Sequence, residues 1–357
     1  MTRIAVVGGG ITGLAAAWEL TRGGAEAVVL ESERHAGGVI LTERRDGFVV
    51  EGGPDGFLAA EPDLQQLAEE VGVADRLVDQ LARGSSLWTG RRLERLPEGQ
   101  AAALLGINEI AQEDLSKGFR SFAGGMADIT EALAARLGPV VLCANGVTSV
   151  APSRSGYRIA LTGGSVLEAE GVILAIPAWV AARLLVGIGV EVARELDDVI
   201  YHPSVTVSLA YRHDQVLSRL EGTGFVAGPE SGGVVRACTY ASQKFPGRAP
   251  VGFVLLRAFL TPGDGDPGAV AHPELARILG LSGAPLWVRA FSWVRGLPRY
   301  TPRHAEHVAE LRRRLTRLPP VAIAGAGVDG VGVSACVRSG REAARTVLRR
   351  IGTMQHV

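Results

Sequence analysis

The chain has 357 residues, of which 37 are basic, 37 are acidic and 47% are apolar. This composition excludes wholesale disorder, and a formal net charge of zero argues against a surface built to attract nucleic acid. The length predicts two domains. Cys143, Cys238 and Cys336 lie far apart and form no paired spacing, so neither a zinc site nor a disulfide framework is expected, and the cytoplasm is the predicted location.

The first elements form a nucleotide-binding pattern. Residues 3–7 predict a buried strand, and the loop after it has the GxGxxG spacing, with glycines at Gly8, Gly10 and Gly13. A helical stretch and a second strand follow, and that strand ends at Glu31. The glycines let the backbone approach a pyrophosphate, the helix N-terminus attracts phosphate, and the acid can accept hydrogen bonds from ribose hydroxyls. Because all these features are in register, we predict a dinucleotide site rather than a simple glycine turn.

The chain after Glu31 favours a flavin over a nicotinamide cofactor. It passes a second glycine pair, Gly37 and Gly38, and then the glycine-rich residues 47–57. A nicotinamide dehydrogenase has no need for these glycines, whereas FAD is larger and is enclosed by more of the chain. Near the C-terminus, residues 321–326 predict another strand, and the helix after it could stabilise negative charge on a reduced flavin ring. Taken alone, this last unit could also be an ordinary strand and helix that close the sheet.

Residues 171–190 are apolar and long enough to span a bilayer. Pro177 interrupts this segment, and Arg183 would lie near the middle of the span at a cost of about 2.5–3.5 kcal/mol. A buried strand, a proline turn and an amphipathic helix are therefore predicted, with no stable membrane insertion.

The glycine loop, the second glycine pair and the EGGPDGF segment resemble the FAD-binding amine oxidase superfamily. Further motifs resemble protoporphyrinogen oxidases, including the bacterial enzymes that act on coproporphyrinogen III: LWTGRRLERLPEG (87–99), SFAGGMADITEAL (121–133), HPSVTVSLAY (202–211), ACTYASQKFPGRAP (237–250), LPRYTPRHAEHV (297–308) and GVGVSACVRSGREAA (330–344). The resemblance runs from end to end. It implies FAD-dependent oxidation of coproporphyrinogen III or protoporphyrinogen IX to the porphyrin in haem biosynthesis, with dioxygen as acceptor and hydrogen peroxide as product.

One segment departs from the family pattern. In the family, the LPEG segment leads into a long helical insertion that covers the substrate cavity and faces the membrane. Here the insertion is truncated near residues 107–113, and the SFAGG segment follows almost at once. A naturally minimal variant, a deletion and a stretch missing from the numbered chain all stay open as explanations. A form that carries the insertion is expected to lie peripheral to the membrane.

The resemblance also implies the cofactor contacts. The glycine loop wraps the pyrophosphate, Glu31 and Ser32 hold the adenosine ribose, and Val147 meets the adenine through its backbone. Residues 53–56, Trp293 and residues 331–333 lie near the flavin ring. The full set is Gly8, Gly9, Gly10, Ile11, Thr12, Gly13, Glu31, Ser32, Gly38, Val39, Gly53, Pro54, Asp55, Gly56, Val147, Trp293, Val331, Gly332 and Val333. No catalytic acid or base is predicted, because the cofactor performs the difficult step. No metal site is predicted, because the sequence contains no metal-binding motif.

The predicted fold class is α/β. Residues 1–60, 120–175 and 290–357 are expected to form a Rossmann-type FAD-binding domain with a parallel sheet. Residues 61–119 are expected to be helix and loop, and residues 176–289 to form a smaller, mostly antiparallel substrate domain. Two other functions stay open: another flavin amine oxidase or desaturase of the superfamily, and a non-catalytic FAD-binding scaffold. The expected partners are a porphyrinogen and dioxygen.

Overall fold

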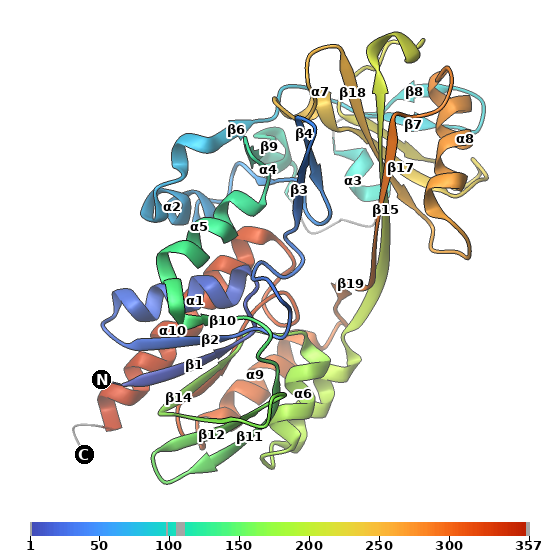
Figure 1. Ribbon diagram of the computed structural model, residues 1–357. Coiled ribbons are helices and arrows are strands. Elements are labelled where there is room, and N and C mark those ends of the chain that lie inside the picture. The colour runs from blue at the N-terminus through green and yellow to red at the C-terminus, as the bar shows by residue number, and fades with distance from the viewer. Residues whose placement is uncertain (1, 98, 105–110, 355–357) are drawn as a thin grey trace.

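The computed structural model describes residues 2–97, 99–104 and 111–354. A five-stranded sheet lies in the lower part of Figure 1 and a seven-stranded sheet lies in the upper part. The long strands β15 (Ile200–Arg212) and β19 (Trp287–Arg299) pair with each other and run from one part into the other. They therefore tie the two parts together.

All strands of the five-stranded sheet are parallel. They are β1 (Arg3–Val7), β2 (Glu26–Leu30), β10 (Val141–Leu142), β14 (Gly171–Leu174) and β20 (Val321–Ile323), arranged in the order β10-β2-β1-β14-β20. The chain builds the sheet outward from β1 in one direction and then from β14 in the other. Dinucleotides bind in the crevice at such a reversal, beyond the carboxyl ends of the strands. The predicted Rossmann-type α/β class is confirmed.

Helices and a small sheet cover both faces of the parallel sheet. One face carries α1 (Ile11–Arg22), α2 (Asp63–Val71), α5 (Ala127–Leu137) and α10 (Val333–Met354); the other carries α6 (Ala178–Val186), α9 (His304–Leu315) and the three-stranded sheet of β11 (Val147–Ser153), β12 (Gly156–Leu161) and β13 (Val166–Ala169).

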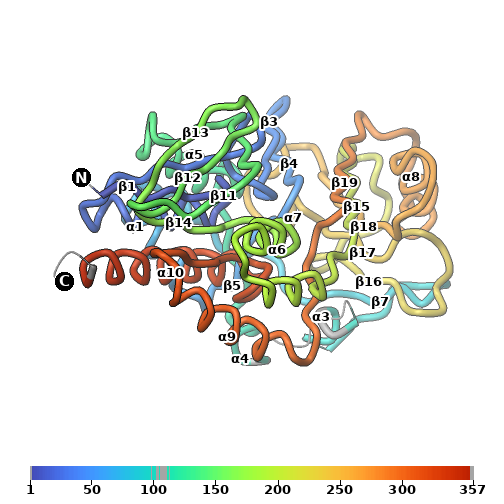
Figure 2. Tube along the Cα trace, turned by 90° about the horizontal axis from the view of Figure 1, so that it is seen from below, coloured from blue at the N-terminus to red at the C-terminus, as the bar shows by residue number. Residues whose placement is uncertain are grey.

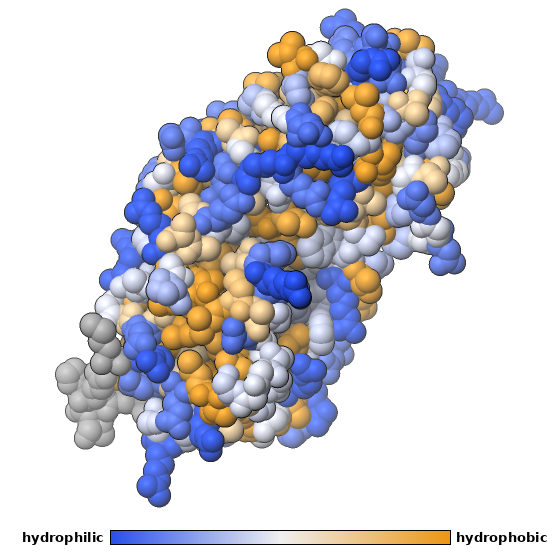
Figure 3. Space-filling model, in the orientation of Figure 1, coloured by the Kyte–Doolittle hydropathy of each residue, from blue (hydrophilic) through white to orange (hydrophobic). Residues whose placement is uncertain are grey.

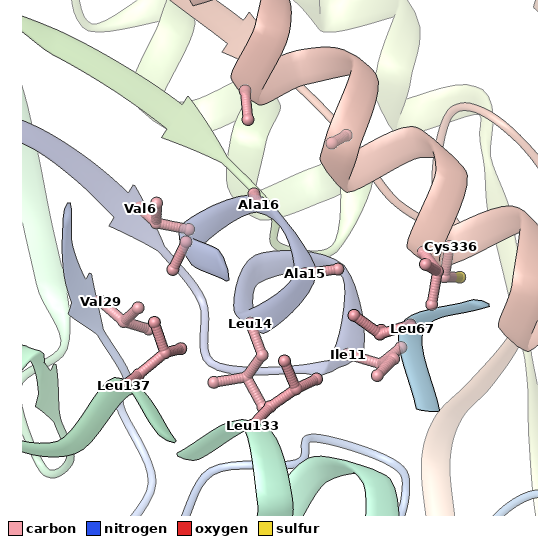
Figure 4. Packing of buried hydrophobic residues seen from close by; sticks show 14 of the residues in the cluster. Val6, Ile11, Leu14, Ala15, Ala16, Val29, Leu67, Leu133, Leu137 and Cys336 are labelled. Carbon is pink, nitrogen blue, oxygen red and sulfur yellow. The ribbon is translucent and has the colours of Figure 1, made fainter. Parts of the chain in front are cut away.

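Buried side chains of β1 explain why its sequence is apolar without alternation. Ile4 and Val6 point into the core on the α1 side, whereas Ala5 and Val7 point into the core on the other side. Figure 4 shows the first of these cores, in which Leu14 of α1 packs against Leu133 of α5. A strand buried on both faces has no polar face to display.

The larger sheet is antiparallel except where β16 pairs with β7. Its order is β19-β15-β18-β17-β16-β7-β8, with β18 (Phe253–Leu260), β17 (Val235–Tyr240), β16 (Gly224–Ala227), β7 (Ser86–Trp88) and β8 (Leu93–Arg95). Helix α8 (Pro267–Leu279) packs on one face, and the hairpin of β3 (Thr42–Arg45) and β4 (Phe48–Glu51) packs on the other through Phe48 and Val50. The remaining elements are β5 (Phe57–Leu58), β6 (Leu77–Asp79), β9 (Phe119–Phe122), α3 (Gln100–Leu104), α4 (Gln112–Ser116) and α7 (Ala241–Lys244).

Two expectations about segment assignment differ from the structure. Strands β7 and β8 extend the large sheet, although helix and loop were predicted for residues 61–119; strands of three residues are too short to show an alternating pattern. Helix α6 packs on the parallel sheet, although the substrate domain was predicted to begin at residue 176. The predicted truncation near residues 107–113 lies partly outside the described residues. The division into domains stays a prediction.

Residues 171–190 fold as β14, a turn at Pro177 and α6, as predicted. Across the described ranges, no helix combines the length and apolar character that a membrane crossing requires. In Figure 2, α10 lies along the parallel-sheet part, and its last turns come close to the start of β1.

Candidate cofactor-binding site

A cavity of about 760 Å³ opens beyond the carboxyl ends of β1, β2 and β14. Its volume lies in the range typical of cofactor pockets. Among the residues predicted for the cofactor, its lining includes Gly8, Gly10, Ile11, Thr12, Glu31, Ser32, Gly38, Val39 and Val147. These residues come from three separate stretches of the sequence, and the parallel sheet brings them to one edge.

The three glycines of the GxGxxG pattern have different reasons to be glycine. A Cβ on Gly8 would lie 2.3 Å from the carbonyl oxygen of Ala175, and a Cβ on Gly13 would lie 1.9 Å from that of Gly8. Both side chains would collide with backbone, so the fold itself requires these two glycines. A Cβ on Gly10 would meet only the Cα of Gly38, at 4.0 Å, among the atoms of the described residues. Gly10 therefore leaves an open space on the cavity wall where a side chain would otherwise lie, and we call this space the cradle.

Helix α1 begins beside this cradle. Gly10 is its N-cap, and within the described ranges no side chain caps the helix. The N–H groups of a first helical turn have no partners within the helix, and the helix dipole adds positive charge there. Arg183 and Arg295 also line the cavity. The donors and charges present therefore fit the pyrophosphate of a dinucleotide.

Glu31 holds the glycine loop in shape. Its carboxylate accepts hydrogen bonds from the Gly9 N–H at 2.6 Å, the Glu33 N–H at 2.8 Å and the Ser32 hydroxyl at 3.1 Å. The residue is 7% exposed. A carboxylate offers about four acceptor positions, so one remains for a ribose hydroxyl.

Other predicted cofactor residues lie away from this cavity wall. Gly9 and Gly13 lie within the loop itself. Val331 and Gly332 directly precede α10, which begins at Val333 and from which Cys336 reaches the cavity. Gly53, Pro54, Asp55, Gly56 and Trp293 form a second group beside the large sheet. The Trp293 indole N–H donates to the Gly52 carbonyl at 2.7 Å. Where these ten residues stand relative to a bound flavin stays a prediction.

A buried charge cluster beside this second group escaped the sequence analysis. Its members are Glu51, Asp55, Lys244, Arg248 and Arg257. Arg257 donates to the Gly53 carbonyl at 2.6 Å, and Arg248 lies 3.5 Å from Glu51. Burial raises the pKa of Glu51, and Arg248 only partly offsets that rise. Burial would also raise the pKa of Asp55, but Lys244 and Arg257 hold it below its ordinary value.

The cavity also contains residues of β15 and β19 that the sequence analysis did not select. Tyr201, Arg295 and Pro298 line it, and the Tyr201 hydroxyl accepts a hydrogen bond from the Ala178 N–H at 2.8 Å. The Arg295 guanidinium lies 4.2 Å from the centre of the Trp179 ring. Strand pairing places these residues at the cavity; Pro298 belongs to the motif at residues 297–308, whereas no local motif marks Tyr201 or Arg295. On the face shown in Figure 3, hydrophobic residues gather in the middle and lower part of the molecule, with hydrophilic residues among them and along the edges.

Three comparisons relate the chain to known proteins. Residues 79–348 match the family described as flavin containing amine oxidoreductase, and residues 6–71 match an NAD(P)-binding Rossmann-like domain. The coproporphyrinogen III oxidase of Propionibacterium freudenreichii subsp. freudenreichii is 27% identical, over 97% of this chain and 90% of that protein. The coproporphyrinogen III oxidase of Bacillus subtilis (strain 168) is 24% identical, over 97% of each.

Those two alignments extend over 484 and 463 residues, whereas this chain has 357, so both relatives carry residues without a counterpart here. Among solved structures, a candidate protoporphyrinogen oxidase from Exiguobacterium sp. 255-15 has a TM-score of 0.84 at 24% identity, covering 98% of this chain and 99% of that one. This likeness shows a shared fold. Since the match at residues 79–348 covers most of the sequence, the protein belongs to the flavin containing amine oxidoreductase family and binds FAD.

Proposed function

We propose that this chain oxidises a porphyrinogen, coproporphyrinogen III or protoporphyrinogen IX, to the corresponding porphyrin in haem biosynthesis. Dioxygen is the final electron acceptor and hydrogen peroxide is the second product. The observation that carries the proposal is the alignment of relatives named coproporphyrinogen III oxidase along 97% of the chain, which includes both the glycine loop and the large sheet.

In this proposal the cofactor supplies a two-electron acceptor, and the protein binds and orients it. The glycine loop, the first turn of α1 and Glu31 bind the adenosine and pyrophosphate. The segment at residues 53–56 would hold the flavin ring. Trp293 donates to the Gly52 carbonyl and Arg257 to the Gly53 carbonyl, and these two hydrogen bonds hold the backbone of the segment in place. These contacts position the ring against the substrate, and no proton transfer is assigned to a side chain.

The direct test is turnover by the FAD-loaded protein. Coproporphyrinogen III and protoporphyrinogen IX should yield fluorescent porphyrin together with hydrogen peroxide. If amines gave peroxide while neither porphyrinogen was consumed, the chain would be an amine oxidase. Tight FAD binding without turnover of either class would identify a scaffold and would refute the proposal.

The truncated insertion should weaken substrate binding more than cofactor binding. Affinity for a small ligand depends on enclosing most of its surface, and water that enters an open site weakens orientation and charge effects. We expect a raised KM and a low kcat for coproporphyrinogen III in this chain, compared with a variant that has a family-type insertion placed between Ile107 and Glu109. FAD titration should give similar affinities for both proteins. Equal kcat/KM values would show that the substrate does not need the insertion.

A further inference from the structure

A second cavity, of about 370 Å³, lies between the large sheet and the segments that carry Asp55 and Lys244. The side chains on its walls are mainly apolar and include Phe119, Val226 and Phe259. Asp55 belongs to the segment that the family resemblance places near the flavin ring, and it lines this cavity too. The cavity therefore begins where a substrate of the flavin is expected. The inference below rests on the proposed function.

Lys244 and Arg83 are the two cationic residues among the described residues that line this cavity; Arg83 is exposed and donates to the Ser116 carbonyl at 2.7 Å, whereas Lys244 is largely buried. Its side chain is 13% exposed, and its ammonium nitrogen lies 3.1 and 2.9 Å from the two carboxylate oxygens of Asp55. The ammonium also lies 5.1 Å from the centre of the Phe119 ring and 5.2 Å from that of Phe245. An ammonium group has three N–H donors, so one remains after both Asp55 oxygens are engaged. An ammonium group that keeps one free N–H donor on a mainly apolar wall can bind an anionic acceptor.

The buried charge cluster that includes Lys244 has more cationic side chains than carboxyl groups. Arg248 and Arg257 are 2% and 5% exposed, and Glu51 is 4% exposed. With Lys244 and Asp55, the cluster holds three cationic side chains and two carboxyl groups. The raised pKa of Glu51 favours its neutral form, which adds to the excess of positive charge. The carboxylates of Asp128 and Glu131 do not offset this charge, because both are paired with Arg44, at 2.7 Å and 2.9 Å.

An unpaired N–H donor of Arg257 also indicates that the cluster lacks a hydrogen-bond acceptor. Its Nη2 donates to Gly53, but its buried Nε has no hydrogen-bond partner among the described residues. Its guanidinium carbon lies 5.0 Å from the centre of the Phe259 ring, which lines the cavity. An unpaired buried donor of a charged group is costly unless something completes it.

We propose that this cavity receives a carboxylate-bearing side chain of the porphyrinogen, with Lys244 as the residue that binds the carboxylate and selects for it. Coproporphyrinogen III carries four propionate groups and protoporphyrinogen IX carries two. The apolar walls accommodate the edge of the macrocycle, and the ammonium binds the acid at its rim. The role is one of specificity, because Lys244 takes no part in the electron transfer.

The first test uses coproporphyrin III, the stable oxidised compound, and its tetramethyl ester as probes of FAD-loaded protein. The acid should bind at least about tenfold more tightly than the ester, as loss of one charge-assisted hydrogen bond implies. Equal affinities would mean that the cavity recognises shape alone and would overturn the proposal.

Three variants test the role of the charge at Lys244. Asp55→Asn leaves the ammonium without its partner and should strengthen binding of the acid several-fold. The double variant Asp55→Asn/Lys244→Met removes the charge without leaving a buried carboxylate unpaired, and it should weaken binding about tenfold. Lys244→Arg keeps the charge and should retain most of the affinity. Far-UV circular dichroism checks that the variant is folded. If Asp55→Asn and the double variant bound the acid equally well, Lys244 would have only a structural role.

The chain offers a matched control, because Lys117 is its only other lysine. Lys117 lies on the surface, 50% exposed, and pairs with Asp114 at 3.3 Å. Lys117→Met should leave coproporphyrin affinity unchanged. In reductive methylation followed by mass spectrometry, the acid should protect Lys244 and leave Lys117 reactive; equal modification of Lys244 with and without the probe would contradict the proposal. These readouts need no turnover, so they separate a failure of this inference from a failure of the proposed oxidase activity.

Discussion

Replacing Gly13 by alanine is expected to destabilise the protein by about 3 kcal/mol or more and to abolish FAD binding through loss of the fold. The added Cβ would lie 1.9 Å from the Gly8 carbonyl oxygen, which is backbone and cannot rotate away. The first turn of α1 would have to separate from the end of β1. Chemical unfolding followed by circular dichroism measures the loss.

Gly10→Ala is the matched variant, because the same methyl group there meets no atom closer than 4.0 Å among the described residues. We expect its unfolding free energy to stay within about 0.5 kcal/mol of the parent, as for an unstrained surface change. Its FAD dissociation constant should nevertheless rise about tenfold or more, since the methyl group fills the cradle beside the helix N-terminus. If Gly10→Ala bound FAD normally, the pyrophosphate would not lie over Gly10.

Replacing Arg248 by methionine is expected to cost about 3–5 kcal/mol at neutral pH, because a buried carboxylate loses its cationic partner. Arg248 lies 3.5 Å from Glu51 and donates to the Ser121 hydroxyl at 2.6 Å and to the Phe122 carbonyl at 3.1 Å. The guanidinium therefore connects the end of β4 to the end of β9. Urea unfolding of the apoprotein at pH 7 measures the effect.

The sign of the pH dependence identifies Glu51 as the cause. Burial already raises the pKa of Glu51 above 4.5, and removal of Arg248 raises it further. A carboxyl group whose folded pKa exceeds its unfolded pKa loses stability as the pH rises from about 4.5 through the folded value. The deficit of Arg248→Met should therefore shrink between pH 7 and pH 5. The double variant Glu51→Gln/Arg248→Met should recover much of the loss at pH 7, whereas a deficit independent of pH would show that lost packing dominates.

Residues that the sequence predicted for the dinucleotide end of the site line one cavity, and the sequence could single them out because the relevant signals are local. The β1 strand, the glycine loop and Glu31 lie within the first 31 residues, and each has a spacing that follows from its chemistry. The cavity wall formed by Arg295 and Tyr201 has no such spacing. Those residues meet through the pairing of β15 with β19, whose register no local pattern reveals.

The charge cluster was missed for the same reason. Arg248 and Phe122, whose carbonyl it binds, are 126 positions apart, and Lys244 and Asp55 are 189 apart. A chain with 37 basic residues gives no reason to single out Lys244, Arg248 and Arg257. Asp55 itself was predicted as a cofactor residue from the family resemblance, and the structure shows that its carboxylate binds Lys244.

The packing of α1 against α10 also determines when the core beside the parallel sheet can close during synthesis on the ribosome. A Cβ on Gly340 of α10 would lie 2.2 Å from the carbonyl oxygen of Thr12 in α1, so the two helices touch backbone to backbone. The β1 strand and α1 emerge from the ribosome before β20 and α10, and their apolar faces are covered only by later segments. A nascent chain must therefore keep β1 and α1 exposed until α10 has been synthesised. The cofactor cavity is also completed late, because Gly325 and Cys336 form part of its wall.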